Sequence, residues 1–347
     1  MNQDIEAIVE LLQKKNKIPK GSFRISSKIF PASFVYRIEI DEFIFYIKKI
    51  KPRFSTVVDN SVLITQLSSE FDALTKFHRL FKDYTNFNVP KPIYLYKEEL
   101  IIATEEVKGE SVIELFCKFG HRFKQKTSRP LQVSKQIGEF LSILHNFETY
   151  PFLEKDLDDT LAYINKRLWD GAFNQRQEEK ISTYLESLYE SIKSDIKRQY
   201  TKCLIHSDFT PMNILYDKNR INVLDFANHR IDHPYNDLIY FKLMIEGQFF
   251  NRIKYKKYRV NELLKAFSNG YGIDFHLISK EKIYQLVLIK ILSIFLKTYS
   301  IRKNIPIIYE MNFRTAIEIK NKIVNLLDLY LIKRKILKIA AQSICSD

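Results

Sequence analysis

Short runs of apolar and β-branched residues, each ended by polar or charged residues, recur in the first third of the chain and again near residue 210. The runs Phe43 to Lys51, Val89 to Tyr96 and Leu100 to Glu105 have the length and composition of strands. Farther on, three apolar pairs predict short buried strands, the last preceded by a polar turn from Asp217 to Asn222: Leu204-Ile205, Ile214-Leu215 and Val223-Leu224.

Apolar residues at helical spacing predict helices through most of the remaining chain. The predicted helices span 4–15, 67–77, 131–147, 161–200 with a break near Gly171, 283–296 and 312–338. The most apolar run, Ile283 to Leu296, is about fourteen residues long and contains Lys290. A bilayer span needs about twenty apolar residues. We therefore predict a core helix there.

The composition is typical of a globular protein with two parts. The chain has 347 residues, and 46% of them are hydrophobic. Its three cysteines, Cys117, Cys203 and Cys345, form neither a metal-binding spacing nor an even set for disulfides. The first residues are polar, unlike a signal peptide. These features predict a cytoplasmic protein.

The positive charge is concentrated in the last third of the chain. The net charge is +14, and residues 241–347 contain 20 Lys and Arg against 8 Asp and Glu. The remaining residues, 1–240, contain 35 against 33. The densest basic clusters lie at 252–259 and 333–338. A field of this sign repels polycations and favours neutral or anionic ligands.

The candidate chemistry lies between the last predicted strands. Asp208 is followed five residues later by Asn213, and Asp225 ends the next apolar run. A carboxylate at Asp208 could accept the proton of an attacking hydroxyl. Asn213 and Asp225 offer the hard oxygen ligands that Mg²⁺ prefers. This pattern predicts phosphate transfer, in which a protein chiefly positions the reactants and neutralises charge.

Three segments resemble motifs of the aminoglycoside phosphotransferase and choline kinase group, small-molecule kinases related to protein kinases. Residues 206–214 resemble the HGDxxxxN catalytic loop, 223–226 the metal-binding strand, and 232–238 the DPxxDLA segment. The resemblance implies the following roles: Asp208 as catalytic base, His206 as organiser of the loop, Asn213 and Asp225 as Mg²⁺ ligands, and Asp237 as a structural aspartate that hydrogen-bonds the loop backbone. Asp237 also fits a helix N-cap, which is compatible with that role.

The resemblance also implies a phosphate-binding lysine in the strand that begins at Phe43. Lys48 follows Tyr46 and Ile47 as the family lysine follows its apolar residues, and it would reach the α- and β-phosphates of ATP. Lys49 is the alternative, because neighbouring strand residues face opposite ways. Glu70 would pair with the lysine.

Other nucleotide contacts are implied near the first strands and after residue 105. Ser33 would donate to a phosphate from the segment 25–37, which lacks the glycine that family members often have there. Glu106 and Val107 resemble the hinge that presents backbone groups to adenine. Ala227 stands where a glycine usually follows Asp-Phe, and this change restricts φ without removing a ligand.

The implied fold is α+β and two-lobed, like that of protein kinases. An N-terminal nucleotide-binding lobe, 1–105, would contain an antiparallel sheet and a helix. A hinge at 106–110 would connect it to a larger, mostly helical catalytic and acceptor-binding lobe, 111–347.

These inferences predict an ATP- and Mg²⁺-dependent phosphotransferase acting on a hydroxyl of a small molecule, such as a sugar, polyol or lipid-linked glycan precursor. The alternatives are a kinase-like binding protein with weak or no catalysis and an aminoglycoside-modifying enzyme, which the charge disfavours. The apolar and basic residues from Leu326 to Ala340 leave peripheral association with an anionic membrane surface open. No recognised nucleic-acid-binding module accompanies the basic clusters, so no nucleic acid partner is predicted.

Overall fold

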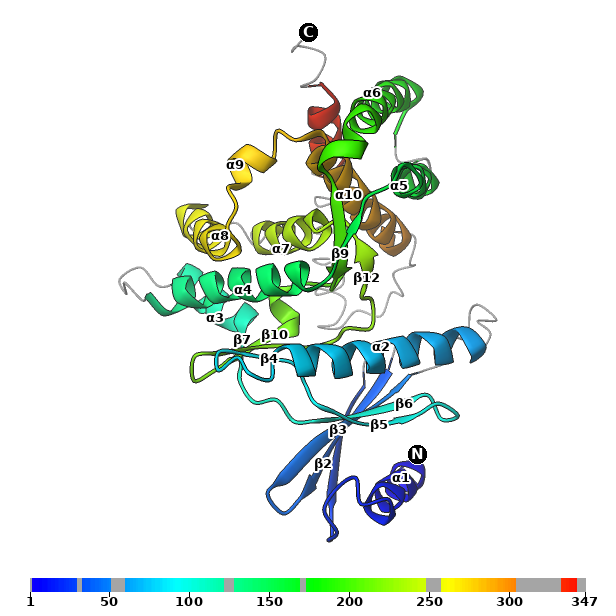
Figure 1. Cartoon of the computed structure of the whole chain (residues 1–347), viewed down its shortest axis with the longest axis vertical. Coiled ribbons are helices and arrows are strands. Elements are labelled where there is room, and N and C mark those ends of the chain that lie inside the picture. Colours follow the sequence, from blue (N-terminus) through cyan, green and yellow to red (C-terminus); the bar gives the residue numbers. More distant parts are fainter. Residues whose placement is uncertain are drawn as a thin grey trace, which may run out of the picture. The chain divides into compact units, whose positions relative to one another are not determined.

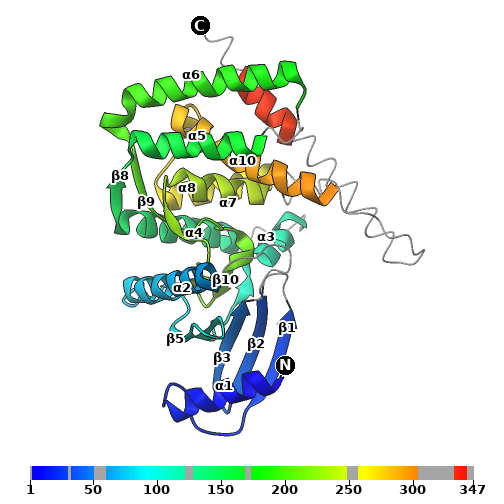
Figure 2. The ribbon, with the colours of Figure 1, turned by 90° about the vertical axis from the view of Figure 1, so that its right-hand side faces the viewer.

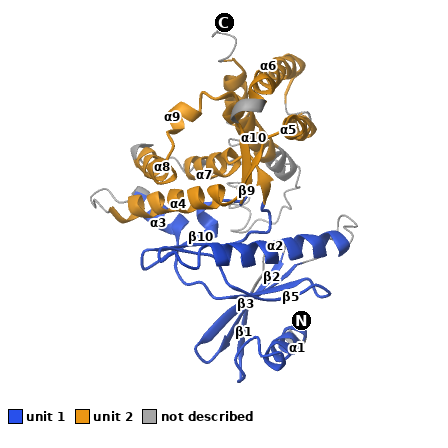
Figure 3. Cartoon of the chain, in the orientation of Figure 1, with its two compact units in different colours: residues 1–119, 206–229 blue, residues 120–205, 230–347 orange. Residues whose placement is uncertain are grey.

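The computed structural model of the chain describes residues 2–29, 33–50, 60–121, 128–168, 173–247, 257–303 and 332–341. The chain divides into two compact units (Figure 3). Unit 1 comprises residues 1–119 and 206–229, and unit 2 comprises residues 120–205 and 230–347. The segment 106–109, expected as a hinge, forms neither helix nor strand. The lobe boundary expected there stays a prediction.

A five-stranded antiparallel sheet with the order β1-β2-β3-β6-β5 forms the first part of unit 1 (Figure 1). Its strands are β1 Arg24–Ile29, β2 Ser33–Ile40, β3 Phe43–Ile50, β5 Pro92–Tyr96 and β6 Ile101–Glu105. Alternate residues of β2, including Ile38 and Ile40, are buried because successive side chains point to opposite faces. Helix α1, Asn2–Lys14, packs Ile5 and Leu12 against this face (Figure 2).

Helix α2 and a second, small sheet complete unit 1 around the candidate catalytic segment. Helix α2, Asn60–Leu80, buries Leu67, Leu74 and Phe77 at helical spacing. The second sheet has the order β4-β11-β10-β7. Its strands are β4 Phe87–Asn88, β7 Glu110–Ser111, β10 Ile214–Asp217 and β11 Arg220–Val223.

Strands β10 and β11 form a tight hairpin. Asp217 pairs with Arg220, so only Lys218 and Asn219 form the turn. Both have positive φ, 44° and 70°, as a two-residue type I′ turn requires. The polar turn expected from Asp217 to Asn222 is therefore wrong in extent. Asp217, Arg220 and Asn222 belong to the paired strands, and the turn itself is two residues long.

Unit 2 is mostly helical. Its elements are α4 Ser128–Phe147, β8 Thr149–Pro151, α5 Glu154–Leu168, α6 Gln175–Gln199, β9 Thr201–Ile205, β12 Arg230–Asp232, α7 Tyr235–Gly247, α8 Lys257–Tyr271, α9 Phe275–Ile278, α10 Lys282–Lys303 and a helical segment at 332–341. Helix α3, Val112–His121, crosses the boundary between the units. Helices α4 and α8 approach closely at Gly138 and Gly270, where an added Cβ would meet the Phe267 and Lys135 carbonyl oxygens.

Most helices expected from apolar spacing are present, including the predicted core helix, which is α10. The predicted break near Gly171 falls between α5 and α6, although Gly171 itself lies outside the described residues. Of the helix expected at 312–338, only 332–338 lies within the described residues, and it is helical. None of the described helices has the length and apolar character to cross a membrane.

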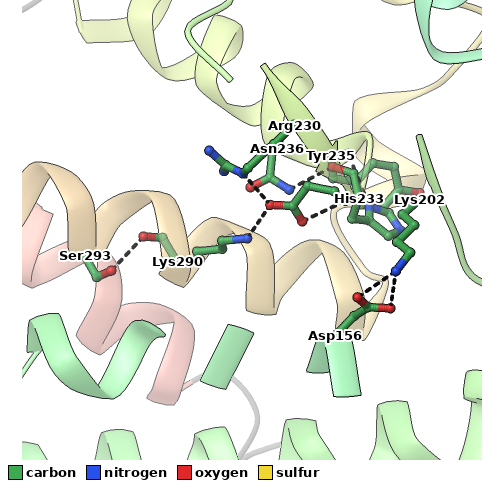
Figure 4. Close-up of polar contacts among 9 residues, drawn as sticks. Asp156, Lys202, Arg230, His233, Tyr235, Asn236, Lys290 and Ser293 are labelled. Atoms are coloured by element: carbon green, nitrogen blue, oxygen red, sulfur yellow. Dashed lines mark hydrogen bonds and ion pairs between the residues drawn. The ribbon is translucent and has the colours of Figure 1, made fainter. Parts of the chain in front are cut away.

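A buried polar cluster joins β12 to helix α10 in unit 2 (Figure 4). The Asp232 carboxylate accepts hydrogen bonds from Lys290 Nζ at 2.7 Å, Arg230 Nε at 3.0 Å and the His233 backbone N–H at 2.8 Å. Burial alone would raise the pKa of Asp232, but the two cations hold it below its ordinary value. Lys290, the charge within the apolar helix, is thus explained by a carboxylate that neutralises it.

The buried side chain of His233, which follows Asp232, should make the stability of the protein depend on pH. It is 4% exposed, and its Nδ1 accepts the Tyr235 backbone N–H at 3.2 Å. Burial lowers its pKa to about 3. Between pH 6.5 and 3, His233 is therefore protonated in the unfolded chain but neutral in the folded chain. The free energy of unfolding consequently falls as the pH falls. From pH 7 to pH 5 this residue should remove about 2 kcal/mol from the free energy of unfolding.

Urea unfolding of the unmodified protein and of His233→Asn at both pH values measures this contribution. Asparagine can still accept the Tyr235 N–H but does not titrate. The stability difference between the two proteins should change by about 2 kcal/mol over this range. A difference that is the same at pH 7 and pH 5 would contradict the assignment.

Candidate active site

The β10–β11 hairpin places Asn213 and Asp225 at the same end of unit 1's second sheet. Ile214 pairs with Val223, and the Leu224 N–H donates to the Asn213 carbonyl oxygen at 2.9 Å. Asn213 therefore lies just before the first strand, and Asp225 lies two residues after the second. Their close placement follows from strand pairing, which forms because both strands are apolar on their buried face.

The Asn213 side chain holds the loop that carries Asp208. Its Nδ2 donates to the Asp208 carbonyl oxygen at 2.9 Å and to Asp208 Oδ2 at 3.1 Å. Because the amide nitrogen makes both bonds, Oδ1 is the side-chain atom of Asn213 left to accept or to bind a cation.

His206 connects the two segments of the site from the buried side. Its Nε2 donates to the Leu224 carbonyl oxygen at 2.8 Å, and its Nδ1 accepts the Asp208 backbone N–H at 3.3 Å. This pair of contacts requires the tautomer that is protonated at Nε2. The ring is fully buried, 4.6 Å from the Phe226 ring centroid. His206 thus organises both the Asp208 loop and the segment before Asp225.

Two residues of the site have a left-handed backbone. Ser207, at the position of the glycine in the resembled motif, has φ of 66°, and Asp225 has φ of 60°. Serine pays a steric penalty in this region, whereas aspartate tolerates it better. The positive φ near Asp225 falls on that residue and not on Ala227, so alanine is accommodated there.

Lys48 lies between two carboxylates in unit 1. Its Nζ is 2.9 Å from Glu70 Oε1 and 3.0 Å from Asp225 Oδ1. Lys49 instead pairs at 3.0 Å with Glu99, in the turn between β5 and β6. Of the two lysines that the sequence left open, the structure brings Lys48 to the candidate site.

The electrostatics of this triad favour the charged forms of Lys48 and Asp225, whereas burial raises the pKa of Glu70. Burial alone would lower the pKa of Lys48, but the charges of Glu70 and Asp225 outweigh it and raise the pKa above its ordinary value. Burial alone would raise the pKa of Asp225, but the Lys48 charge and hydrogen bond hold the pKa below its ordinary value. Asp225 therefore remains an anion at neutral pH, with its side chain 44% exposed.

The remaining nucleotide residues expected from the sequence are also in unit 1. The Glu106 backbone N–H donates to the Ile44 carbonyl oxygen at 3.0 Å, and its carboxylate bonds Arg37 Nε at 3.2 Å. Val107 follows in the segment that is neither helix nor strand. Ser33 begins β2 and is buried, while residues 30–32 of the expected phosphate-covering segment lie outside the described residues.

Asp237 lies in unit 2, within the first turn of α7. The helix begins at Tyr235, so Asp237 is not its N-cap. The side chain is fully buried, and Oδ2 is 3.2 Å from His145 Nε2. His145 also contacts the Tyr271 hydroxyl through Nδ1 at 2.9 Å. His145 is a buried histidine with partners on both ring nitrogens, which is the arrangement of a structural residue.

His229 is a residue of this site that sequence reasoning missed. Its Nδ1 donates to the Phe226 carbonyl oxygen at 2.7 Å, and its Nε2 lies 3.3 Å from Ser69 Oγ. It therefore connects the segment after Asp225 to helix α2 beside Glu70. The only sequence signal was its position four residues after Asp225, which does not distinguish it from neighbouring polar residues.

Within the described residues, no group of three or more His, Cys, Asp or Glu side chains is arranged to hold a metal ion. A magnesium site does not require one, because Mg²⁺ keeps several waters and substrate oxygens and is commonly held by one or two protein oxygens. The Asn213 amide oxygen and the Asp225 carboxylate are such a donor set.

An antiparallel sheet with a paired lysine, followed by a loop and hairpin that carry two carboxylates and an amide, has the arrangement expected of a phosphotransferase. The chain belongs to the phosphotransferase enzyme family, whose model matches residues 56–276. It is therefore a phosphotransferase with an alcohol group as acceptor, as the sequence motifs predicted. The match begins after Lys48, so the placement of that lysine rests on its contacts with Glu70 and Asp225.

Solved structures share the fold of this chain. A thermostable mutant of aminoglycoside phosphotransferase APH(4)-Ia, in a ternary complex with AMP-PNP and hygromycin B, is 11% identical over 98% of this chain and 99% of that chain, with a TM-score of 0.57. Choline kinase from Cryptosporidium parvum is 13% identical over 98% of each chain, with a TM-score of 0.55. At these identities the likeness shows the fold alone, and it confirms the predicted α+β kinase-like fold. No curated protein matches the chain.

Proposed function

We propose that the protein transfers the γ-phosphate of ATP, with Mg²⁺, to a hydroxyl of a small molecule. The observation that carries this proposal is the position of Lys48 between Glu70 and Asp225, at 2.9 Å and 3.0 Å. A cation held between two buried or half-buried carboxylates is oriented and charged, as a phosphate-binding group must be. The complex of a structural neighbour with AMP-PNP, an analogue of ATP, supports ATP as the nucleotide.

The nucleotide would be bound by unit 1. Lys48 would contact the α- and β-phosphates, and Glu70 would orient it. Because the Glu106 N–H is already bonded to Ile44, we assign the amide donor for adenine to Val107 and the carbonyl acceptor to Glu106. Ser33, at the start of β2, would donate to a phosphate.

The metal would be held by Asn213 Oδ1 and the Asp225 carboxylate. When bound, Mg²⁺ would supply positive charge that neutralises the phosphates. The residues are suited to it, because one neutral and one anionic oxygen are hard ligands and the low pKa of Asp225 keeps its carboxylate ionised.

Asp208 would act as the general base. Asn213 Nδ2 holds one carboxylate oxygen, Oδ2, and the His206 ring fixes the backbone N–H of the same residue. The carboxylate is thereby aimed, and it would take the proton of the acceptor hydroxyl as that oxygen attacks the γ-phosphorus. His206 would support the site from a buried position without touching the reacting atoms.

The acceptor is proposed to be neutral or anionic. Residues 241–347 contain 20 Lys and Arg against 8 Asp and Glu. A field of this sign disfavours a polycationic aminoglycoside. Peripheral membrane association is left out of the proposal, because Ile336 and Ala340, apolar residues of the segment considered for it, are buried within unit 2.

Thermal-shift titration tests the nucleotide half of this proposal. At ten times its Kd, Mg-ATP should stabilise the protein by about 1.4 kcal/mol, which raises the Tm by a few degrees. The Lys48→Met variant should lose this shift. Lys49 is the neighbouring lysine and pairs with Glu99, so the control variant Lys49→Met should keep the shift. A panel of sugars, polyols, anionic hydroxyl compounds and aminoglycosides then identifies the acceptor by ADP release.

An unmodified protein without a shift at millimolar Mg-ATP would contradict the proposed function and favour a kinase-like binding protein. An equal shift in Lys48→Met would contradict the assignment of Lys48 only. Preferential phosphorylation of aminoglycosides would contradict the proposed neutral or anionic acceptor. The proposed transfer of phosphate to a hydroxyl would still hold.

A further inference from the structure

Unit 2 contains a cavity of about 480 Å³ that none of the proposed catalytic residues lines. Its walls come from α6, α7, α9, α10 and the helical segment at 332–341, which all belong to unit 2. A volume of this size falls within the range of small-molecule pockets, about 300–1,000 Å³. The cavity is therefore large enough for a compact ligand.

Three lysines from separate helices line this cavity. Lys242 comes from α7, Lys282 from the start of α10, and Lys335 from the segment at 332–341. The neighbouring polar lining includes His276 and Ser279, which can donate hydrogen bonds. No aspartate or glutamate lines the cavity among the described residues. Its polar lining is therefore dominated by donors and positive charge.

Among the described residues, Glu246 is the carboxylate that pairs with two of these lysines. It pairs with Lys242 through Oε1 and is 3.4 Å from Lys335 Nζ through Oε2. One negative charge thus serves two ammonium groups, and Lys282 adds a third cation at the rim. Burial lowers the pKa of Lys335, although the charge of Glu246 opposes this shift. Glu246 therefore offsets only part of the cost of burying this ammonium group.

Most of the remaining lining is apolar, apart from Gln285 and the Tyr184 hydroxyl, which are hydrogen-bonded to each other. Ile239 and Leu243 of α7, Leu288 of α10 and Ile339 of the last described helix face the cavity. Such a surface is suited to a hydrocarbon or aromatic body, because apolar area removed from water contributes affinity. The cationic lysines and the apolar wall together specify a ligand with two ends of different character.

We propose that this cavity binds a small molecule that has an anionic group, a carboxylate or phosphate, on an apolar body. The anion would lie against Lys242 and Lys335, and the apolar body against Leu243 and Leu288. The inference concerns unit 2 alone and does not depend on the proposed function, because the proposed catalytic residues Asp208, Asn213 and Asp225 are in unit 1.

Isothermal titration of the full chain with four aromatic probes tests the charge requirement. Phenyl phosphate and benzoate carry the anion, benzyl alcohol is neutral, and benzylamine is cationic. The anions should bind, with an affinity that falls as salt rises, while the neutral and cationic probes should bind at least about tenfold more weakly. The ratio of phenyl phosphate to benzoate affinity decides between phosphate and carboxylate.

Variants locate the binding. Lys242→Gln and Lys335→Gln should each weaken the better anion by about tenfold or more, because a charged hydrogen bond is lost. Lys338→Gln removes the same charge from the same helix at an exposed position outside the cavity and should leave the affinity within about twofold. Lys48→Met should also leave it unchanged, which separates this site from the proposed phosphate site.

Chemical labelling of the unmodified protein supplies a readout that no variant's folding affects. An amine-reactive reagent followed by mass spectrometry should modify Lys335 less in the presence of the anion, with Lys338 unaffected. Equal affinity for all four probes, loss of binding in Lys48→Met only, or labelling of Lys335 unchanged by a bound anion would each overturn the proposal.

Discussion

Asp208→Asn should reduce phosphate transfer by about 10²–10⁴-fold while leaving Mg-ATP binding nearly intact. The substitution removes the negative charge and the basicity of the side chain. Its new Oδ1 can still accept the hydrogen bond that Asn213 Nδ2 makes to Asp208 in the unmodified protein, so the loop should keep its conformation. We assign no nucleotide or metal contact to Asp208, so the thermal shift with Mg-ATP should persist.

Two measurements check this result: ADP formation with an accepted hydroxyl compound, and the Tm with and without Mg-ATP. Asp217→Asn is the matched control, because Asp217 lies in the hairpin that follows the Asp208 loop, at the turn end and opposite Arg220. It should keep its turnover within about twofold, as a surface substitution usually does. Unchanged turnover in Asp208→Asn would show that another group takes the proton.

The fold was predictable because its pattern is local. The apolar pairs at 204–205 and 214–215 lie in β9 and β10. Of the third pair, Val223 is the last residue of β11, whereas Leu224 lies just beyond that strand. The amphipathic spacing of Leu67, Leu74 and Phe77 identified α2. Each of these signals depends on side chains within one element, which a single sequence records.

Site details that depend on backbone geometry could not be predicted. Nothing in the residue types indicates that φ is positive at Ser207 and Asp225, because serine and aspartate usually adopt other conformations. The hairpin turn also proved shorter than its polar composition suggested. Lys218 and Asn219 alone make it, since strand pairing extends to Asp217 and Arg220.

Contacts between residues that are distant in the sequence could not be predicted either. Lys48 and Lys49 are both strand lysines, and only the positions of Glu70, Asp225 and Glu99 separate them. The contact of His229 with Ser69 joins segments 160 residues apart. The lysines of the unit 2 cavity come from three separate helices, and nothing in the sequence indicated that these lysines line one cavity.

Asp225→Asn should abolish the magnesium-dependent part of nucleotide binding and reduce phosphate transfer by about 10²–10³-fold, the scale of losing one electrostatic contact to the transition state. Asparagine is the informative replacement, because it tolerates the φ of 60° at this position, whereas alanine would add backbone strain. The variant keeps the shape of the side chain but loses the charge that would bind Mg²⁺ and that pairs with Lys48.

The measurement is the nucleotide-induced Tm shift with Mg²⁺ and with EDTA. In the unmodified protein the shift should be larger with Mg²⁺. In Asp225→Asn the two shifts should be equal. Asp217→Asn again serves as the control, because it removes the same charge from the same hairpin away from Lys48. A magnesium-dependent shift that survives in Asp225→Asn would exclude Asp225 as the metal ligand and leave it as a partner of Lys48 alone.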